Sequence, residues 1–267
     1  MVSIGWVKRK TIKGFRMLKE DGLVATLRFI IIFLFEDNWL LGRFVELRGN
    51  TGTLDGCTFD LDQPVIATFL KSRFLLNSWE EEARYLFKKY QPVDLPLIEL
   101  GSSIGIVSCI TNKQLTNPES HLVVEANPLL LPILEKNRAQ NGCRFQVLNK
   151  AIAYGSAEVH FNFNGRCNEG RLSSTAADIT VPATTLREIL EITGFTKANM
   201  VCDIEGAEIA LIENEGQVLS DHFDWIIIEV HFSEGPEKTR ALLEKLNFKL
   251  IEEFENNHIY RNNRWSR

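Results

Sequence analysis

The fold is decided by residues 95 to 115, which read LPLIELGSSIGIVSCITNKQL. Residues 95–100 form an almost continuous apolar run, which is typical of a buried strand. Gly101 and Gly105 follow at a turn, where residues without a side chain can adopt backbone conformations that are closed to others. The next stretch places apolar residues on one helical face, namely Ile104, Val107 and Leu115. A strand, a glycine turn and a helix in this order predict a β-α-β unit.

The same alternation of strands and helices continues to the C-terminus. A second strand is predicted in HLVVEA (121–126), and further buried strands in RFQVLN, ANMVCDI and DWIIIEVHF. The segments FKLIEEFE and HIYRNN are predicted to close the sheet as an antiparallel pair. The chain is therefore expected to form a doubly wound, mostly parallel α/β sheet.

The helix after the second strand carries its own boundary signals in NPLLLPILEKNRAQNG. Asn127 is predicted to be its N-cap, Pro128 its first residue and Gly142 its stop. Pro132 would then lie beyond the first turn, where proline removes a backbone hydrogen bond. A kink is expected at that position.

The region before the sheet, residues 1–75, is predicted to be an extension of a single domain at 76–267. Its first 40 residues are expected to form two short helices, the second carrying the apolar run from Phe29 to Phe35. The first helix has apolar residues at helical spacing, namely Ile12, Phe15 and Leu18.

A β-hairpin and a further helix are expected next. Strand-like runs flank Asn50-Thr51-Gly52, whose residues tolerate a positive φ, so the hairpin turn is predicted there. Ser78 is predicted to cap the helix in SWEEEARYLFKKY.

The composition is that of a globular protein, with 45% hydrophobic and 24% charged residues among 267. The five cysteines are scattered singly, which argues against a disulfide framework or a zinc site. Cys109 and Cys202 lie in apolar runs and are expected to be small buried hydrophobes. We expect reduced thiols in a cytoplasmic protein.

The charge is unevenly distributed along the chain. The net charge of -5 provides no basic field that would attract nucleic acid. The first 19 residues nevertheless hold six Lys and Arg and no acid. The apolar faces of residues 1–40 need a cover, and either a second copy of the chain or a membrane surface would supply it. The run from Phe29 to Phe35 is far shorter than the ~20 residues of a membrane span, and no signal-peptide pattern precedes it.

The turn from Glu99 to Gly105 carries the signal for a cofactor. Glycines between a strand and a helix let a ligand approach the backbone at a helix N-terminus. A dinucleotide site needs further glycines where Ser103 and Ile106 stand, so pyrophosphate binding is disfavoured. The remaining acid-x-Gly-x-x-x-Gly pattern resembles motif I of class I S-adenosylmethionine methyltransferases.

Two acids fit that cofactor. Its methionine end carries an ammonium group, which Glu99 is predicted to serve through the surrounding polar network. Glu125 follows Gly105 by 20 residues, at the end of the second strand, where a carboxylate takes both ribose hydroxyls. A tight turn beside a solvated Glu125 is the alternative account of the same pattern. The predicted cofactor-binding residues are Glu99, Gly101, Ser102, Ser103, Gly105, Glu125, Ala126 and Asn127.

Further segments narrow the resemblance. LIELGSSIG, LVVEANP, LNKAIAYGSAEVHF, VPATTLREI, VCDIEGAEIALIE and IIIEVHF occur in the order found in FkbM-type methyltransferases. The chain resembles this family over residues 76–232, most specifically in the D-x-E-G-x-E block at 203–208. SWEEEARYL looks like the upstream acidic helix of the family, with Glu80 and Glu82 at its acidic positions. The resemblance implies a seven-stranded sheet of the class I methyltransferase type and methyl transfer to a hydroxyl of a sugar, polysaccharide or polyketide-like product.

The sequence departs from the family pattern at three places. Val201 stands where lysine is usual, and Arg187 replaces the usual acid after TTL. Motif I reads Glu99-Leu100-Gly101-Ser102 in place of Asp-x-Gly-Ala. None of these changes removes the cofactor pattern, but the first two leave the substrate class open.

The catalytic residues are predicted from the strand order that the class implies. The strands that end at Asp203 and at Glu229-Val230-His231 should be neighbours, and ligands bind outside such carboxyl ends. Methylating a hydroxyl calls for a general base or a metal ion. Asp203, Glu205 and His231 are the predicted catalytic residues, with His231 as the base by its intrinsic pKa. Alternatively, Asp203, Glu229 and His231 bind Mg or Mn.

Each of these residues also has a structural explanation. Glu208, and Glu205 with it, fit acids in the first turn of a helix, and a single histidine is as often structural as catalytic. The segment NFNGRCNEGRLSST (162–175) is predicted to be a mobile loop that faces the acceptor.

Three functions are therefore compared. An O-methyltransferase acting on a small-molecule or glycan acceptor is the leading hypothesis. A non-catalytic binding subunit of the same fold is disfavoured by the acids at three strand ends. A nucleotide-dependent oxidoreductase is disfavoured by the missing glycines.

Overall fold

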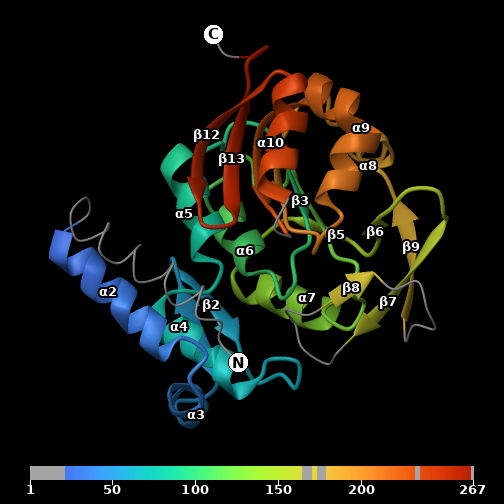
Figure 1. Ribbon diagram of the computed structural model, residues 1–267. Coiled ribbons are helices and arrows are strands. Elements are labelled where there is room, and N and C mark those ends of the chain that lie inside the picture. Colours follow the sequence, from blue (N-terminus) through green and yellow to red (C-terminus); the bar gives the residue numbers. More distant parts are fainter. Residues whose placement is uncertain (1–21, 164–169, 173–178, 232–234, 266–267) are drawn as a thin grey trace.

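The computed structural model describes residues 22–163, 170–172, 179–231 and 235–265. Its centre is a seven-stranded sheet in the order β12-β13-β11-β10-β3-β4-β5 (Figure 1). The five strands from β11 to β5 are parallel, and β13 runs antiparallel to both of its neighbours. The predicted doubly wound sheet with an antiparallel closing strand is confirmed. Its strands are β3 (Leu97–Leu100), β4 (His121–Val124), β5 (Gln146–Leu148), β10 (Ala198–Cys202), β11 (Phe223–Glu229), β12 (Phe248–Phe254) and β13 (Asn257–Asn262).

Helices cover both faces of this sheet because its inner strands are apolar on both sides. Ile98 and Met200 pack with helices on one face, while Leu97 and Val201 pack with helices on the other. The first face carries α8 (Leu186–Thr193), α9 (Glu208–His222) and α10 (Gly235–Lys245). The second face carries α5 (Glu81–Tyr90), α6 (Ile106–Asn112) and α7 (Leu131–Gln140).

The N-terminal region lies beside the second face (Figure 1). Buried residues of α3 and the hairpin, such as Val45 and Phe59, share one hydrophobic cluster with Ile106 of α6 and Leu134 of α7. The elements here are α2 (Gly22–Phe35), α3 (Trp39–Leu47), β1 (Thr51–Leu54), β2 (Cys57–Asp60), the 3-10 helix η1 (Thr68–Lys71) and α4 (Ser72–Leu76). Within the described ranges, no helix is both long and apolar enough to cross a bilayer.

The predicted helix around Phe29–Phe35 is confirmed as α2, whereas the one around Ile12, Phe15 and Leu18 lies outside the described residues. The hairpin exists, but its predicted turn is wrong. Asp55 and Gly56, with φ of 45° and 79°, form the turn between β1 and β2. Asp-Gly suits a two-residue hairpin turn because both positions need a positive φ. The upstream run that looked like a strand belongs to α3.

Two predicted helix starts are also wrong. Glu80, not Ser78, precedes the first residue of α5, and it does so in a left-handed conformation with φ of 47°. Helix α7 begins at Leu131 rather than at Pro128, which places Pro132 in its first turn. Proline is well tolerated there because the first N–H groups of a helix have no intrahelical acceptor. No kink at Pro132 is therefore required.

A second, four-stranded sheet was not predicted from the sequence. It consists of β6 (Ala151–Ile152), β7 (Glu158–Phe163), β8 (Gly170–Leu172) and β9 (Ile179–Thr184) in the order β6-β9-β7-β8. Strands β7 and β8 pair antiparallel within the segment that was predicted as a loop at 162–175. The described residues of that segment, 162–163 and 170–172, are therefore in strands, and its remaining residues lie outside the described ranges.

Candidate active site

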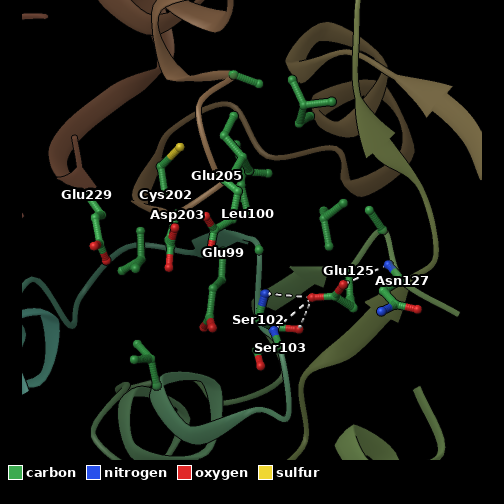
Figure 2. Close-up of a pocket in the computed structure, with 18 of the residues that line it drawn as sticks. Glu99, Leu100, Ser102, Ser103, Glu125, Asn127, Cys202, Asp203, Glu205 and Glu229 are labelled. Atoms are coloured by element: carbon green, nitrogen blue, oxygen red, sulfur yellow. Dashed lines mark hydrogen bonds between the residues drawn. The ribbon is translucent and has the colours of Figure 1, made fainter. Parts of the chain in front are cut away.

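A cavity opens at the carboxyl ends of β3, β4, β10 and β11 (Figure 2). An acid from each strand end lines it: Glu99 is the penultimate residue of β3, Glu125 and Asp203 directly follow β4 and β10, and Glu229 ends β11. The lining includes all eight predicted cofactor-binding residues except Gly105, and it includes Asp203 and Glu205. His231 is not part of the lining but contacts residues that are.

The two glycines of the turn after β3 allow neighbouring elements to pack closely around the site. Gly101 has a φ of 79°, and a Cβ atom there would lie 1.7 Å from the backbone oxygen of Asp203. A Cβ on Gly105, with a φ of 83°, would lie 2.4 Å from Leu134 Cδ1. Gly101 therefore lets the ends of β3 and β10 approach each other. Gly105 lets helices α6 and α7 do the same.

Glu125 is held by the backbone of that turn. Its Oε2 accepts hydrogen bonds from the N–H groups of Ser102 (3.0 Å) and Ser103 (2.7 Å). Its Oε1 accepts one from the N–H of Asn127 at 2.7 Å (Figure 2). Burial raises the pKa of Glu125, against the lowering effect of these backbone hydrogen bonds. The carboxylate is thus fixed at the cavity wall, and its remaining lone pairs are available to a ligand.

Ala126 and Asn127 continue the cavity wall after β4. The Asn127 side chain accepts a hydrogen bond from the N–H of Leu129 at 3.0 Å, so it caps a turn and not the helix α7. Asn149, which sequence reasoning missed, donates to the backbone oxygens of Glu125 and Ala126 at 2.8 and 3.0 Å. These contacts hold the chain after β4 in place.

Glu99 lies at the other side of the cavity floor and is almost completely buried. Its Oε1 accepts a hydrogen bond from the hydroxyl of Ser108 at 2.6 Å. Its Oε2 lies 3.3 Å from His121 Nε2 but has no hydrogen-bond donor in the described part of the chain. A buried carboxylate oxygen without a donor is costly, so this atom is a natural partner for a ligand N–H.

Glu80 joins the same side of the cavity from the start of α5. Its Oε1 accepts a hydrogen bond from Trp79 Nε1 at 3.2 Å. Burial, together with the nearby charge of Glu99, raises the pKa of Glu80 to about 7. The sequence indicated this acid only through the family resemblance, because nothing in its local spacing points to a cavity.

His231 lies at the centre of a group of carboxylates. Its Nδ1 is 2.9 Å from Glu208 Oε1, and its Nε2 is 3.5 Å from Glu205 Oε2 and 3.7 Å from Asp203 Oδ1. Glu229 is slightly farther, at 4.0 Å from Nε2. The predicted convergence of the β10 and β11 ends is therefore present in the structure.

Glu208 holds the Nδ1 side of the His231 ring. It is the first residue of α9, as predicted for a first-turn acid, and its Oε1 also accepts the N–H groups of Ile204 and Gly206 at 3.1 Å. Although burial raises the pKa of Glu208, the hydrogen bond with His231 lowers it overall. Glu208 is thus an acceptor, so Nδ1 of His231 carries the hydrogen and Nε2 faces the cavity acids.

The charges around His231 shift its titration. Burial alone would lower its pKa, but the hydrogen bond with Glu208 and the carboxylates of Glu208, Asp203 and Glu205 raise it to about 9. The imidazole is consequently protonated at neutral pH in the unliganded protein. His231 can therefore act as the predicted base at neutral pH only if an additional positive charge nearby lowers its pKa.

For Asp203, in contrast, the surroundings disfavour the charged form. Burial, followed by the charges of Glu229 and Glu205, raises its pKa well above the ordinary value. Its Oδ1 is buried and accepts no hydrogen bond from the described residues. Both shifts reflect the excess of negative charge at this site.

A metal ion would find ligands at the same place. Atoms of Asp203, Glu205 and His231 lie within 4.8 Å of one another in the described part of the chain. Glu229, which the sequence analysis named as a candidate ligand, falls outside this group, and Glu205 takes its place.

The profile of the Methyltransferase FkbM domain matches residues 100–250. No curated protein matches the chain.

Solved structures give weaker likenesses. A methyltransferase FkbM from Methylobacillus flagellatus KT has 13% identity and a TM-score of 0.47, over 84% of this chain and 58% of that one. A ribosomal protein L11 methylase from Lactobacillus delbrueckii subsp. bulgaricus has 14% identity and a TM-score of 0.41, over 67% and 74%. A NADB-Rossmann superfamily protein from Streptococcus agalactiae has 12% identity and a TM-score of 0.41, over 67% of both chains.

The profile match covers more than half of the chain and includes the ends of β3, β4, β10 and β11 that form the cavity. On that match, the protein belongs to the FkbM methyltransferase family.

Proposed function

We propose that this methyltransferase uses S-adenosylmethionine to methylate a hydroxyl group of a sugar, polysaccharide or related small molecule. The observation that carries the proposal is the group of carboxylates around His231 at the ends of β10 and β11, directly beside the glycine turn after β3. When bound, the cofactor supplies an electrophilic methyl group on a sulfonium.

The acidic cavity suits a cationic cofactor. Glu80, Glu99 and Asp203 line it, and Lys150 is the one Lys or Arg among the described lining residues. The orphaned Glu99 Oε2 fits the ammonium group of the methionine end, and Glu125 fits the ribose hydroxyls at the opposite side. A pyrophosphate would meet repulsion from the same acids.

The proton of the acceptor hydroxyl goes to His231. Glu208 holds Nδ1–H, which leaves Nε2 as the proton acceptor once the ring is neutral. Positive charge in the cavity lowers the pKa of His231 from about 9, since it offsets the surrounding carboxylates. The bound cofactor would supply the methyl group to the acceptor oxygen, giving up its sulfur–carbon bond, and His231 Nε2 would keep the proton that the hydroxyl loses. Asp203 orients the acceptor or the imidazolium.

A divalent cation is the alternative source of that charge. Asp203, Glu205 and His231 would hold Mg or Mn, and the ion would acidify the acceptor hydroxyl. The buried Asp203 Oδ1 without a donor favours this possibility. Both versions predict that Asp203→Asn lowers turnover, and only the metal version predicts that a chelator abolishes it.

Calorimetry with S-adenosylmethionine and NAD side by side tests the proposal first. Binding of S-adenosylmethionine alone is expected, and preferential binding of NAD would favour an oxidoreductase instead. Methyl transfer from labelled cofactor to a panel of mono- and oligosaccharides and amine-bearing analogues then tests the acceptor. Cofactor binding without transfer to any hydroxyl would favour a binding subunit, and transfer to amines only would exclude the hydroxyl assignment.

A further inference from the structure

The two N-terminal helices present an apolar surface that the described part of the molecule leaves uncovered. Of the fifteen large hydrophobic side chains that are exposed among the described residues, eleven belong to α2 and α3. Val24, Leu34, Leu40 and Leu47 are 60–83% exposed. We call the exposed side chains of α2 and α3 the N-terminal apolar face. Its concentration on two consecutive helices distinguishes it from the single exposed hydrophobics that any surface carries.

Helix α2 contacts α4 through one apolar side, where Leu27 and Ile32 line a groove with Leu76, and through its one charged side chain. Arg28 is its one charged residue, and it pairs with Glu81 at 2.5 Å and reaches the backbone oxygen of Asn77 at 3.4 Å. Thr26 is buried and bonds within the helix. Figure 1 shows α2 along one edge of the molecule, away from the seven-stranded sheet. The side that faces outward is therefore uncharged.

Helix α3 adds the residue types that lie where apolar and aqueous phases meet. Trp39 is 58% exposed, and the guanidinium of Arg43 stands over its ring at 5.8 Å. Arg48 stands over Phe44 at 5.5 Å in the same way. Tryptophan and arginine combine an apolar body with a polar end, so they are suited to the headgroup level of a bilayer.

The charge of residues 1–19 favours a membrane surface over a second copy of the chain as the partner of this face. Residues 1–19 carry six Lys and Arg and no acid, although the whole chain has a net charge of -5. In a symmetric dimer the same surface of both copies meets, which would bring two basic segments toward each other. An anionic surface attracts the same segment, at about 1 kcal/mol for each cation near it.

We propose that the N-terminal apolar face binds the surface of an anionic phospholipid bilayer. The side chains of α2 and α3 enter the boundary between headgroups and acyl chains, and the positive charge of the preceding sequence favours anionic headgroups. The helices lie on the bilayer and do not cross it, in agreement with their lengths of 14 and 9 residues.

Sedimentation of the full chain with vesicles tests this proposal. Vesicles of phosphatidylcholine with phosphatidylglycerol are expected to carry the protein down, and vesicles of phosphatidylcholine alone to carry down much less. High salt should reduce the bound fraction because it screens the headgroup charge. Changing Lys8, Lys10 and Lys13 to Gln should weaken binding by roughly fivefold for each lost cation.

The apolar contribution is tested with matched exposed positions. Replacing Ile31 and Leu34 by Glu should lower vesicle binding by more than about tenfold, since each buried aliphatic side chain is worth roughly 1.5–3 kcal/mol. Ile192→Glu is the control, because Ile192 is 58% exposed like Leu34 at 60% but lies on α8. All three positions are on the surface, and an unchanged thermal unfolding transition will show that the variants are folded.

Two results would overturn the proposal. The first is equal sedimentation of the wild-type chain with and without anionic lipid, or none with either. The second is a wild-type dimer in light scattering that the Ile31 and Leu34 variant converts to a monomer, without vesicle binding by either protein. That result would assign the face to a second copy of the chain.

Discussion

The two ends of the cavity differ in how fully their polar groups are satisfied. At the β4 end, both oxygens of Glu125 accept backbone N–H groups, so the carboxylate is already placed before any ligand arrives. At the β10 and β11 ends, carboxylates converge on His231, and Asp203 Oδ1 lacks a donor among the described residues. The first end is organised by its own loop, whereas the second has an excess of negative charge that a proton or a cation must balance.

The difference suggests a division of labour. A group that is rigid and satisfied contributes mainly to binding, because its interactions are the same in the ground state and the transition state. A group whose pKa is shifted by its neighbours is suited to proton transfer. If so, substitutions at the β4 end should change mainly binding, and substitutions at the β10 and β11 ends should change mainly turnover.

The largest effect is expected from the removal of His231. His231→Ala should lower turnover at saturating cofactor by roughly 10²–10⁴, the range for loss of a general base, with little change in cofactor affinity. The measurement is methyl transfer from labelled S-adenosylmethionine. His222→Ala is the control, since His222 bonds only the backbone oxygen of Thr196 in the described structure. Near wild-type turnover of His231→Ala would remove the proton-transfer role.

Gly101→Ala should disturb both ends at once. The new Cβ would lie 1.7 Å from the Asp203 backbone oxygen in a left-handed conformation, so we expect a loss of about 2–4 kcal/mol in the free energy of unfolding. Gly142→Ala is the matched control, because Gly142 also has a positive φ but has nothing within 4 Å of its Cβ position. It should cost only about 1 kcal/mol. Urea unfolding compares the two, and equal losses would show that the close approach is unimportant.

Glu125→Gln should affect binding and not turnover. The amide group would face the N–H of Ser102 or of Asn127, so the turn would lose a charged acceptor worth about 1.5–3 kcal/mol. Calorimetry should show cofactor affinity reduced by roughly 10- to 100-fold, with turnover at saturation retained. Glu119→Gln, at an exposed position, serves as the control. An equal loss in turnover would break the distinction between the two ends.

The pH dependence of stability is the smallest expected effect. The folded-state pKa of His231 is raised from 6.5 to about 9, so its contribution to stability is fully present below pH 6.5 and is lost as the pH rises through about 9. The raised pKa of Asp203 acts in the same direction. A pKa shift of this size corresponds to at most about 3 kcal/mol, and we expect wild-type protein to lose roughly 1–2 kcal/mol between these pH values because solvent screens the partly exposed ring. His231→Gln should lose less, and parallel curves for the two proteins would contradict the assignment.

Local patterns in the sequence were sufficient for the sheet and for the glycine turn beside the cavity. The apolar runs predicted the strands of the sheet, and the glycine spacing predicted the turn after β3. The carboxyl-end rule placed Asp203 beside Glu229 and His231. These predictions succeeded because each depends on a short segment or on the direction of a parallel strand.

The predicted turn and helix start were wrong where two nearby sequence signals could fill the same structural role. Asn50-Gly52 and Asp55-Gly56 both read as turns, and the hairpin took the second because it pairs Cys57 with Leu54 and buries Phe59. Ser78 reads as a cap, but the chain turns at Glu80 instead and places that acid in the cavity. Such choices depend on the core that each alternative buries, which no short window contains.

What the sequence alone determined is the class of fold, the glycine turn and the identity of the acids at the strand ends. The tertiary structure decided how those acids interact, because the contacts join residues far apart in the chain. Glu208 and His231 are 23 positions apart, and their hydrogen bond both orients the imidazole and raises its pKa. The approach of Gly101 to Asp203 likewise exists only in the folded sheet. Residue types are written in the sequence, but pKa values depend on distance and burial, which only the packed structure fixes.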